Sequence, residues 1–418
     1  MDCVTNPIFM IQVNGVILDK IVGKSGFRQG CPLSPYLFII CSQLLSNAFK
    51  FKGDNLGLKI APLAPRISHL LYADDILIFS NTKEDNIKKI KKIMEKYCCW
   101  TGQIINKNKS SLIFSKNTCR RRKKKISMLL GIKESKDLYY LGIKLTQRRR
   151  SASDFLHILE KASSKLNIWG KKFISTVGRI TLIKSVIQAL PVYYSSLSLV
   201  PISVLKKLDK MCRDFLWKKG DGNNGLNYVA WKDLCKPLKL GGMGIQSAVE
   251  SVEPLRAKLV WKFHNEPNSL LSKSIYAKHG KQFLHPMRSQ NPSPTWKLYL
   301  SGAKALKNIV KWKIKDGISI NIMKDIWLLD RKLECWPTFI SNDIDNIPNL
   351  SNFITEGSWN AEKLSKYFGV DLVKLICNQK IDNDNPEDKL ELLNSHSGFT
   401  LSAMAKNANS KKIEIDLH

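Results

Sequence analysis

Several common features are missing from this sequence. No hydrophobic run is long enough to cross a lipid bilayer, and Met1-Asp2-Cys3 does not begin the basic-then-apolar pattern of a secretory signal. The ten cysteines include no C-x-x-C pair, and the seven histidines have no spacing typical of metal ligands. These absences argue against a membrane protein, a disulfide framework and a zinc cluster. They favour buried thiols in a reducing, intracellular compartment.

Acidic residues are scarce relative to basic ones. The chain has 35 Asp and Glu against 67 Lys and Arg, a formal net charge of +32 over 418 residues. A hydrophobic content of 44% and a charged content of 24% are those of a globular protein, and the length predicts two or three domains. So large a positive charge on a folded chain predicts a polyanionic partner. Nucleic acid is the first candidate and an anionic membrane surface a weaker one.

Two adjacent carboxylates, Asp74 and Asp75, lie between two short apolar runs. This pattern predicts a tight β-hairpin with both arms buried and the two carboxylates at its tip. Two neighbouring negative charges repel each other, and burial would penalise both, whereas a divalent cation removes the difficulty. Carboxylate oxygens are ligands that Mg²⁺ prefers, so the tip is a candidate metal site. The alternative is an ordinary Asp-Asp turn.

Residues 26–35 contain two glycines and two prolines and lead into an apolar helix, which we expect to be buried, that runs to about Phe49. Ser34 is a candidate N-cap with Pro35 at the first helical position. Backbone N–H groups at such a helix start can bind phosphate, although a simple loop-to-helix connection is the alternative. Before this loop, Asn14-Gly15 predicts a hairpin over residues 8–22.

The rest of the chain predicts an α+β first domain, residues 1–150, followed by helices. Within the first domain we expect an amphipathic helix over 83–100 and strands over 111–115 and 139–145. The basic run 120–125 predicts a solvated loop or a patch that contacts a nucleic-acid backbone, with nuclear targeting as a further possibility.

Regular apolar spacing predicts a helical region over 151–220 and a mostly helical C-terminal region over 226–418, joined by a linker at 221–225. The basic side chains of the first region would suit a duplex held by its phosphates, or they form an ordinary solvated face. Within the second region, Asp316-Gly317 predicts a local hairpin and 361–377 a helix. The remaining predicted helices cover about 155–169, 178–190, 204–217, 250–264, 269–278 and 295–309.

With these pieces in order, the chain resembles the reverse transcriptases of plant non-LTR (LINE-type) retrotransposons. Tyr72-Ala73-Asp74-Asp75 resembles the palm-hairpin motif of that family. The other matching motifs are 26–35, 102–110 and 140–143, followed by segments that resemble the thumb and the region downstream of it in plant members. The resemblance implies a partial palm over 1–150, a helical thumb over 151–220 and the family's C-terminal region over 226–418.

The resemblance also implies an activity, RNA-directed DNA polymerisation by two-metal nucleotidyl transfer on an RNA template and a DNA primer. Asp74 and Asp75 would be the catalytic residues and the ligands of Mg²⁺ or Mn²⁺. The residues implied to bind template or nucleotide are Arg28, Gln29, Gly30 and Pro32. Those implied to bind the primer are Tyr72, Leu141 and Gly142.

The chain departs from the family in what it lacks. In the family, a further metal-binding aspartate lies on a strand upstream of the loop that corresponds to Gly26. Here only 25 residues precede Gly26, and Asp2 and Asp19 stand in the wrong sequence context to replace that aspartate. The fingers, an endonuclease domain and a C-terminal Cys/His segment also have no counterpart. We therefore expect a chain cut at both ends and inactive in isolation. Its alternatives are a non-catalytic nucleic-acid binder and an unstable pseudogene product with an exposed strand edge.

Overall fold

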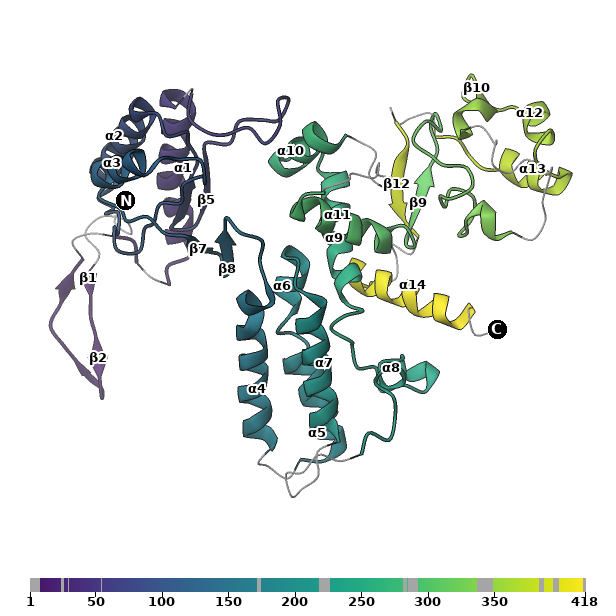
Figure 1. Ribbon diagram of the computed structural model, residues 1–418, viewed down its shortest axis with the longest axis horizontal. Coiled ribbons are helices and arrows are strands. Elements are labelled where there is room, and N and C mark those ends of the chain that lie inside the picture. Colours follow the sequence, from purple (N-terminus) through teal and green to yellow (C-terminus); the bar gives the residue numbers. More distant parts are fainter. Residues whose placement is uncertain are drawn as a thin grey trace. The chain divides into compact units, whose positions relative to one another are not determined.

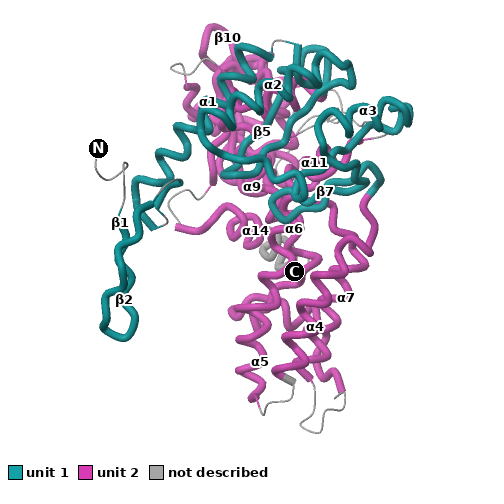
Figure 2. Tube along the Cα trace, turned by 90° about the vertical axis from the view of Figure 1, so that its left-hand side faces the viewer, with its two compact units in different colours: residues 1–149 teal, residues 150–418 magenta. Residues whose placement is uncertain are grey.

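The computed structural model describes residues 8–23, 26–28, 30–53, 55–170, 174–217, 226–280, 284, 292–336, 349–382, 387–393 and 398–415. They form helices and small two-stranded antiparallel sheets, so the α+β prediction is confirmed. The chain divides into two compact units, residues 1–149 and 150–418, shown in teal and magenta in Figure 2. Among the helices of the described residues, none combines the length and apolar character that a membrane span requires.

Unit 1 begins with a thin ribbon and continues into helices and two hairpins (Figure 1). The ribbon consists of β1 (Ile8–Phe9), β2 (Gln12–Val13), β3 (Val16–Ile17) and β4 (Ile21–Val22). The other elements are α1 (Ser34–Lys52), β5 (His69–Tyr72), β6 (Asp75–Ile78), α2 (Glu84–Thr101), α3 (Arg120–Leu130), β7 (Asp137–Tyr140) and β8 (Ile143–Thr146).

The ribbon confirms the hairpin predicted at Asn14-Gly15. Val13 pairs with Val16, and both turn residues have positive φ, +50° and +86°. Asn and Gly tolerate this left-handed backbone better than other residues, which is why the local sequence is decisive here.

The core of unit 1 lies between α1, α2, α3 and the β5–β6 hairpin. Its fully buried members are Leu45, Phe49, Leu56, Ile87, Ile90, Ile93, Tyr97, Phe114 and Ile126. The prediction that α1 is buried along its length is wrong, because only its C-terminal half reaches this core. On its N-terminal half Tyr36, Ile39 and Ile40 are 60–67% exposed.

Three other predictions in unit 1 are also corrected. Residues 111–115 form no strand; Leu112 makes one isolated bridge with Glu134, and Phe114 is buried in the core. Residues 139–145 are not one strand but parts of two, β7 and β8, which pair across a turn. The basic run 120–125 lies in the first turns of helix α3 rather than in a loop.

Unit 2 opens with helices. These are α4 (Leu156–Gly170), α5 (Thr176–Leu182), α6 (Val192–Leu197), α7 (Ile202–Leu216), α8 (Trp231–Leu234), α9 (Val252–Asn265), α10 (Leu270–His279) and α11 (Pro294–Leu306). The later elements are β9 (Val310–Lys313), β10 (Ile354–Thr355), β11 (Ser358–Trp359), α12 (Ala361–Ser365), α13 (Val370–Cys377), β12 (Lys389–Leu392) and α14 (Leu401–Ile415).

Helices α4, α5 and α7 confirm the helical prediction for the start of this unit. The helix expected over 178–190 is interrupted, since α5 passes into a π-helical turn, Ile183–Ile187, before α6 begins. The linker predicted at 221–225 lies outside the described residues. Similarly, the helix expected over 361–377 is divided into α12 and α13.

The local hairpin predicted at Asp316-Gly317 is wrong. Strand β9 pairs instead with β12, more than seventy residues later, with Trp312 opposite Leu390. The loop after β9 is held by Asp388, a carboxylate only 9% exposed. Its Oδ1 accepts hydrogen bonds from the backbone N–H groups of Lys315, Asp316 and Gly317 at 2.8–3.1 Å, and its Oδ2 accepts one from Ser319 at 3.1 Å.

His264 in α9 predicts an acid sensitivity of unit 2. Burial lowers the pKa of this imidazole to about 4, and the positive charge of Lys389 adds to the effect. The unfolded chain, with a pKa near 6.5, therefore binds more protons than the folded chain between about pH 4 and 6.5. Stability is present above this window and is lost as the pH falls through it, by up to about 3 kcal/mol.

The measurement is urea unfolding followed by tryptophan fluorescence at several pH values. Nine of the ten tryptophans lie in residues 150–418, so the signal reports on unit 2. The His264→Gln variant should have a flatter stability profile between pH 4 and 6.5 than the parent chain. Parallel profiles for the two proteins would contradict the assignment.

Candidate active site

The two adjacent carboxylates stand at the turn of the β5–β6 hairpin. Tyr72 pairs with Asp75, so that Ala73 and Asp74 form a two-residue turn. Ala73 has a φ of +48°, a left-handed conformation that costs a residue with a Cβ about 1 kcal/mol or more. The strand pairing on both sides of the turn holds this residue in place and fixes the direction of the two aspartates.

Both carboxylates are exposed, as is the Tyr72 ring, at 62%. The prediction that both arms of the hairpin are buried is wrong. Leu71, Ile76 and Ile78 are only partly buried where they pack on the core. The sheet has two strands, so no third strand of the described residues covers its edges.

His69 anchors the far end of β5 to helix α1. Its ring stacks on Phe49 with centroids 5.0 Å apart, and its Nε2 hydrogen-bonds to the Ser46 hydroxyl at 3.0 Å. Burial lowers the pKa of His69, and the positive charge of Lys50 contributes. The hairpin is therefore fixed at its base, and its turn presents the carboxylates to solvent.

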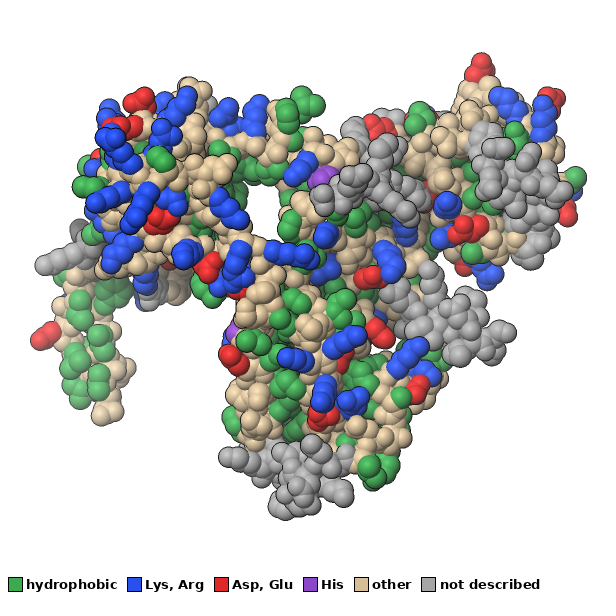
Figure 3. All heavy atoms as spheres, in the orientation of Figure 1, with side chains coloured by type: hydrophobic (Ala, Val, Ile, Leu, Met, Phe, Trp, Pro, Cys, Tyr) green, Lys and Arg blue, Asp and Glu red, His purple; other side chains and the backbone are tan. Residues whose placement is uncertain are grey.

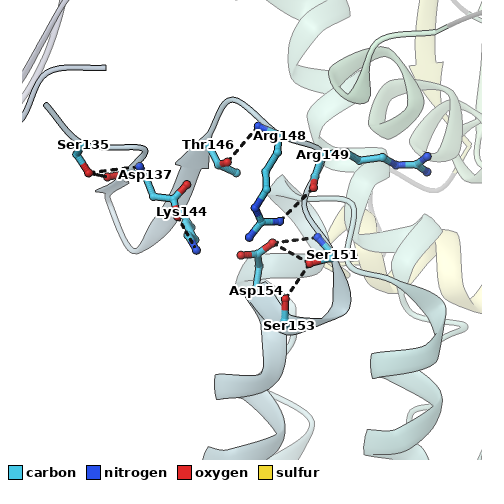
Figure 4. Close-up of polar contacts among 9 residues, drawn as sticks. All are labelled: Ser135, Asp137, Lys144, Thr146, Arg148, Arg149, Ser151, Ser153 and Asp154. Carbon is cyan, nitrogen blue, oxygen red and sulfur yellow. Dashed lines mark hydrogen bonds and ion pairs between the residues drawn. The ribbon is translucent and has the colours of Figure 1, made fainter. Parts of the chain in front are cut away.

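The second hairpin, β7–β8, turns at Leu141 and Gly142, which have φ values of +49° and +75°. An ion pair of 2.9 Å between Lys144 and Asp137 joins its strands (Figure 4), and the hydrogen bond from Lys144 lowers the pKa of Asp137. At the end of β8 the backbone N–H of Arg148 donates to the Thr146 hydroxyl at 3.2 Å. These contacts fix the turn that carries the two predicted primer-binding residues.

Tyr140 lies immediately before that turn, where it pairs with Ile143. Burial raises the pKa of its phenol, and the negative charge of Asp75 and the neighbouring Tyr72 raise it further. The charge of Asp75 therefore reaches the strand that precedes the β7–β8 turn. Tyr140 was not among the predicted site residues, although its position beside Leu141 was the signal that could have identified it.

The loop before α1 has an environment that favours anions. Gly30 adopts a φ of +83°, and the Arg28 guanidinium lies 5.9 Å from the centre of the Phe9 ring. The backbone N–H of Leu33 lowers the pKa of the Cys31 thiol, as does that of Ser34, because both N–H groups stabilise a negative charge at the helix start. Pro32 is exposed, and Gln29 lies outside the described residues.

The predicted N-cap role of Ser34 is wrong. Leu33 is the capping residue and makes no side-chain cap, whereas the Ser34 hydroxyl donates to the Arg28 carbonyl at 2.7 Å. The Ser34 hydroxyl therefore closes the loop, and no side chain among the described residues caps the first turn of the helix.

Comparison with known proteins identifies the fold that carries these hairpins. Residues 2–145 match the model of the family described as reverse transcriptase (RNA-dependent DNA polymerase), a range that includes both hairpins and the loop before α1. The match supports the predicted resemblance of this part of the chain to the reverse transcriptases of non-LTR retrotransposons.

The similarity to other proteins extends beyond the matched residues, although the chain spans well under half the length of some of these relatives. An Arabidopsis thaliana protein named as a ribonuclease H protein is 30% identical over 227 residues, 53% of this chain and 37% of the relative. An uncharacterised mitochondrial protein of the same plant is 28% identical over 149 residues, 34% of this chain and 95% of the relative. The transposon TX1 149 kDa protein of Xenopus laevis is 24% identical over 263 residues, 61% of this chain but 19% of its own length.

The carboxylates of the β5–β6 hairpin suit a hard divalent cation. Asp74 and Asp75 offer exposed oxygen donors from a rigid turn, and Mg²⁺ is commonly held by one or two carboxylates together with substrate phosphates and water. Among the described residues, no group of three or more Asp, Glu, His or Cys side chains comes together as a metal site. The hairpin therefore provides two ligands and leaves the other positions to groups outside it.

Proposed function

We propose that Asp74 and Asp75 are the metal-binding half of the active site of an RNA-directed DNA polymerase. The observation that carries this proposal is the turn of the paired β5–β6 hairpin, which exposes both carboxylates. The match of residues 2–145 to the reverse transcriptase family supports the proposal.

In this proposal each predicted residue has a place around a growing primer end. Tyr72, Leu141 and Gly142 hold the primer terminus against the hairpin, while Arg28, Gln29, Gly30 and Pro32 position template and nucleotide beside the start of α1. Mg²⁺ or Mn²⁺ bound at Asp74 and Asp75 would supply charge stabilisation to the transferring phosphates. The N–H groups that lower the Cys31 pKa are suited to the nucleotide's phosphates.

We assign residues 1–150 to part of a palm, 151–220 to a thumb and 226–418 to the C-terminal region of plant LINE-type proteins. Helices α4, α5 and α7, together with the exposed lysines of α4 and α7, support the second assignment. The partners are an RNA template and a DNA primer, bound chiefly through phosphates.

The 418-residue chain is proposed to be catalytically incomplete. A polymerase palm places two metal ions about 3.5–4 Å apart. Two carboxylates from one hairpin do not complete that arrangement, and none of the described residues joins them. The second candidate function, a non-catalytic nucleic-acid binder, is favoured by the same observation together with the net charge of +32.

Primer extension and duplex binding separate the two functions. Purified chain is incubated with an RNA template, a DNA primer, nucleotides and Mg²⁺ or Mn²⁺, and binding to the same primer–template is measured in parallel. Extension that requires Asp74 and Asp75, in a form of the protein with a third palm carboxylate, supports the polymerase. Salt-sensitive binding that both substitutions leave intact, without extension in any form, supports the binder.

A further inference from the structure

Helices α2 and α3 carry a dense positive charge away from the hairpin turn. Residues 83–136 contain seventeen Lys and Arg and four Asp and Glu. Figure 3 shows blue side chains gathered over the part of unit 1 that these helices form. Glu84 begins α2 nine residues after Asp75, beyond the end of β6 that is opposite the turn.

Three of the four carboxylates in this region form ion pairs. Glu84 accepts from Lys88 at 3.0 Å and from Lys125 at 2.6 Å, an interaction that joins the two helices. Glu95 lies 3.8 Å from Lys91, and Glu134 lies 2.7 Å from Lys123. The cations without a carboxylate partner within the described part of the chain are Lys89, Lys92, Lys96, Arg120, Arg121, Arg122 and Lys124, all exposed.

This charge does not serve the fold of α3. Three arginines and three lysines occupy the N-terminal half of the helix, and the positive end of the helix dipole disfavours those in the first turn. No acidic residue stands in the first turn to offset them. A ligand with closely spaced negative charges would relieve this repulsion.

We propose that the exposed face of α2 and α3 binds duplex nucleic acid through its phosphates, as a contact surface separate from the hairpin. Charge complementarity favours this occupant, since a row of phosphates matches a row of Lys and Arg on two packed helices. A nuclear-import receptor, which would bind the basic run as an extended peptide, fits less well. The run is held in a helix whose Ile126 is 5% exposed, so it would have to unfold from the core.

The test is the triple variant Arg120→Glu, Arg121→Glu and Lys124→Glu in the full chain, with fluorescence anisotropy of a short labelled DNA duplex and of an RNA duplex of the same sequence. At salt concentrations between about 50 and 200 mM, the variant should bind each duplex at least about tenfold more weakly than the parent chain. The slope of log K against log salt concentration should become shallower by an amount that corresponds to about three fewer phosphate contacts. Because acidic residues suit a helix N-terminus, the thermal melting of the variant should not fall.

The matched control makes the same charge change elsewhere. Lys366, Lys374 and Lys380 are exposed in unit 2, and their replacement by Glu should alter duplex affinity much less. An equal loss in both triple variants, or no loss in the α3 variant, would overturn the proposal; so would capture by a nuclear-import receptor with duplex affinity unchanged. Asp74→Asn and Asp75→Asn should leave duplex binding by the α2–α3 face intact. Failure of the proposed duplex-binding surface is therefore distinguishable from failure of the polymerase proposal.

Discussion

Asp74→Asn and Asp75→Asn are each expected to lower RNA-templated primer extension by at least about a thousandfold, in any form of the protein that supplies a third palm carboxylate. Each substitution replaces an ionised ligand by a neutral amide that holds a divalent cation poorly. Both side chains are exposed at a turn, so neither change removes buried contacts, and melting should be unaffected. The measurement is incorporation of labelled nucleotide at saturating primer–template.

Asp19→Asn is the matched control for these two variants. Asp19 is an exposed carboxylate of unit 1 next to strand β4, and its replacement by Asn removes the same charge. Because the sequence context of Asp19 does not fit the missing metal ligand, primer extension should be unchanged. A loss in Asp19→Asn comparable to that in Asp75→Asn would contradict the assignment of the site. Extension by the 418-residue chain alone would contradict its proposed incompleteness.

Asp388→Ala is expected to destabilise unit 2 by about 4 kcal/mol. The substitution removes an acceptor from four backbone N–H groups, of which that of Gly317 is buried and those of Lys315 and Asp316 are half-buried. A buried donor left unpaired costs about 1–3 kcal/mol. The loop 315–319 would then lose its attachment to the start of β12, and the β9–β12 pair would open. Urea unfolding followed by tryptophan fluorescence measures the change.

Two further variants of acidic residues in unit 2 sharpen this prediction. Asp388→Asn keeps one oxygen acceptor but turns an amide donor toward another N–H, so it should cost less than the alanine change yet clearly more than zero. Asp330→Ala removes an exposed carboxylate and should change stability by less than about 0.5 kcal/mol. Equal stability of Asp388→Ala and Asp330→Ala would show that the hydrogen bonds to Asp388 contribute nothing net.

Local signals in the sequence were sufficient where the structure is local. Asn14-Gly15 predicts its hairpin because turn chemistry alone decides it. The β5–β6 hairpin and its carboxylate tip were predicted for the same reason, since two residues separate the paired strands. The degree of burial of its arms was not, because burial depends on which elements cover the sheet.

Predictions failed where distant or unusual contacts decide the structure. Strand β9 pairs with a segment more than seventy residues away, so the nearby Asp-Gly signal was misleading. The β7–β8 turn was missed because Leu141 has a positive φ, which is uncommon for a residue with a side chain. The effect of Asp75 on the pKa of Tyr140 comes from a residue some sixty positions away, and no periodicity encodes it.

The most direct test of the metal half-site is iron-mediated cleavage of the 418-residue chain with primer–template bound. Fe²⁺ takes the place of Mg²⁺ and reduces added hydrogen peroxide to hydroxide and a hydroxyl radical that cuts the backbone close to the ion, while added ascorbate returns Fe³⁺ to Fe²⁺. We expect cuts within residues 72–76 that excess Mg²⁺ suppresses and that Asp75→Asn removes. Cuts only elsewhere, or cuts at 72–76 that persist in Asp75→Asn, would contradict a metal site at this hairpin.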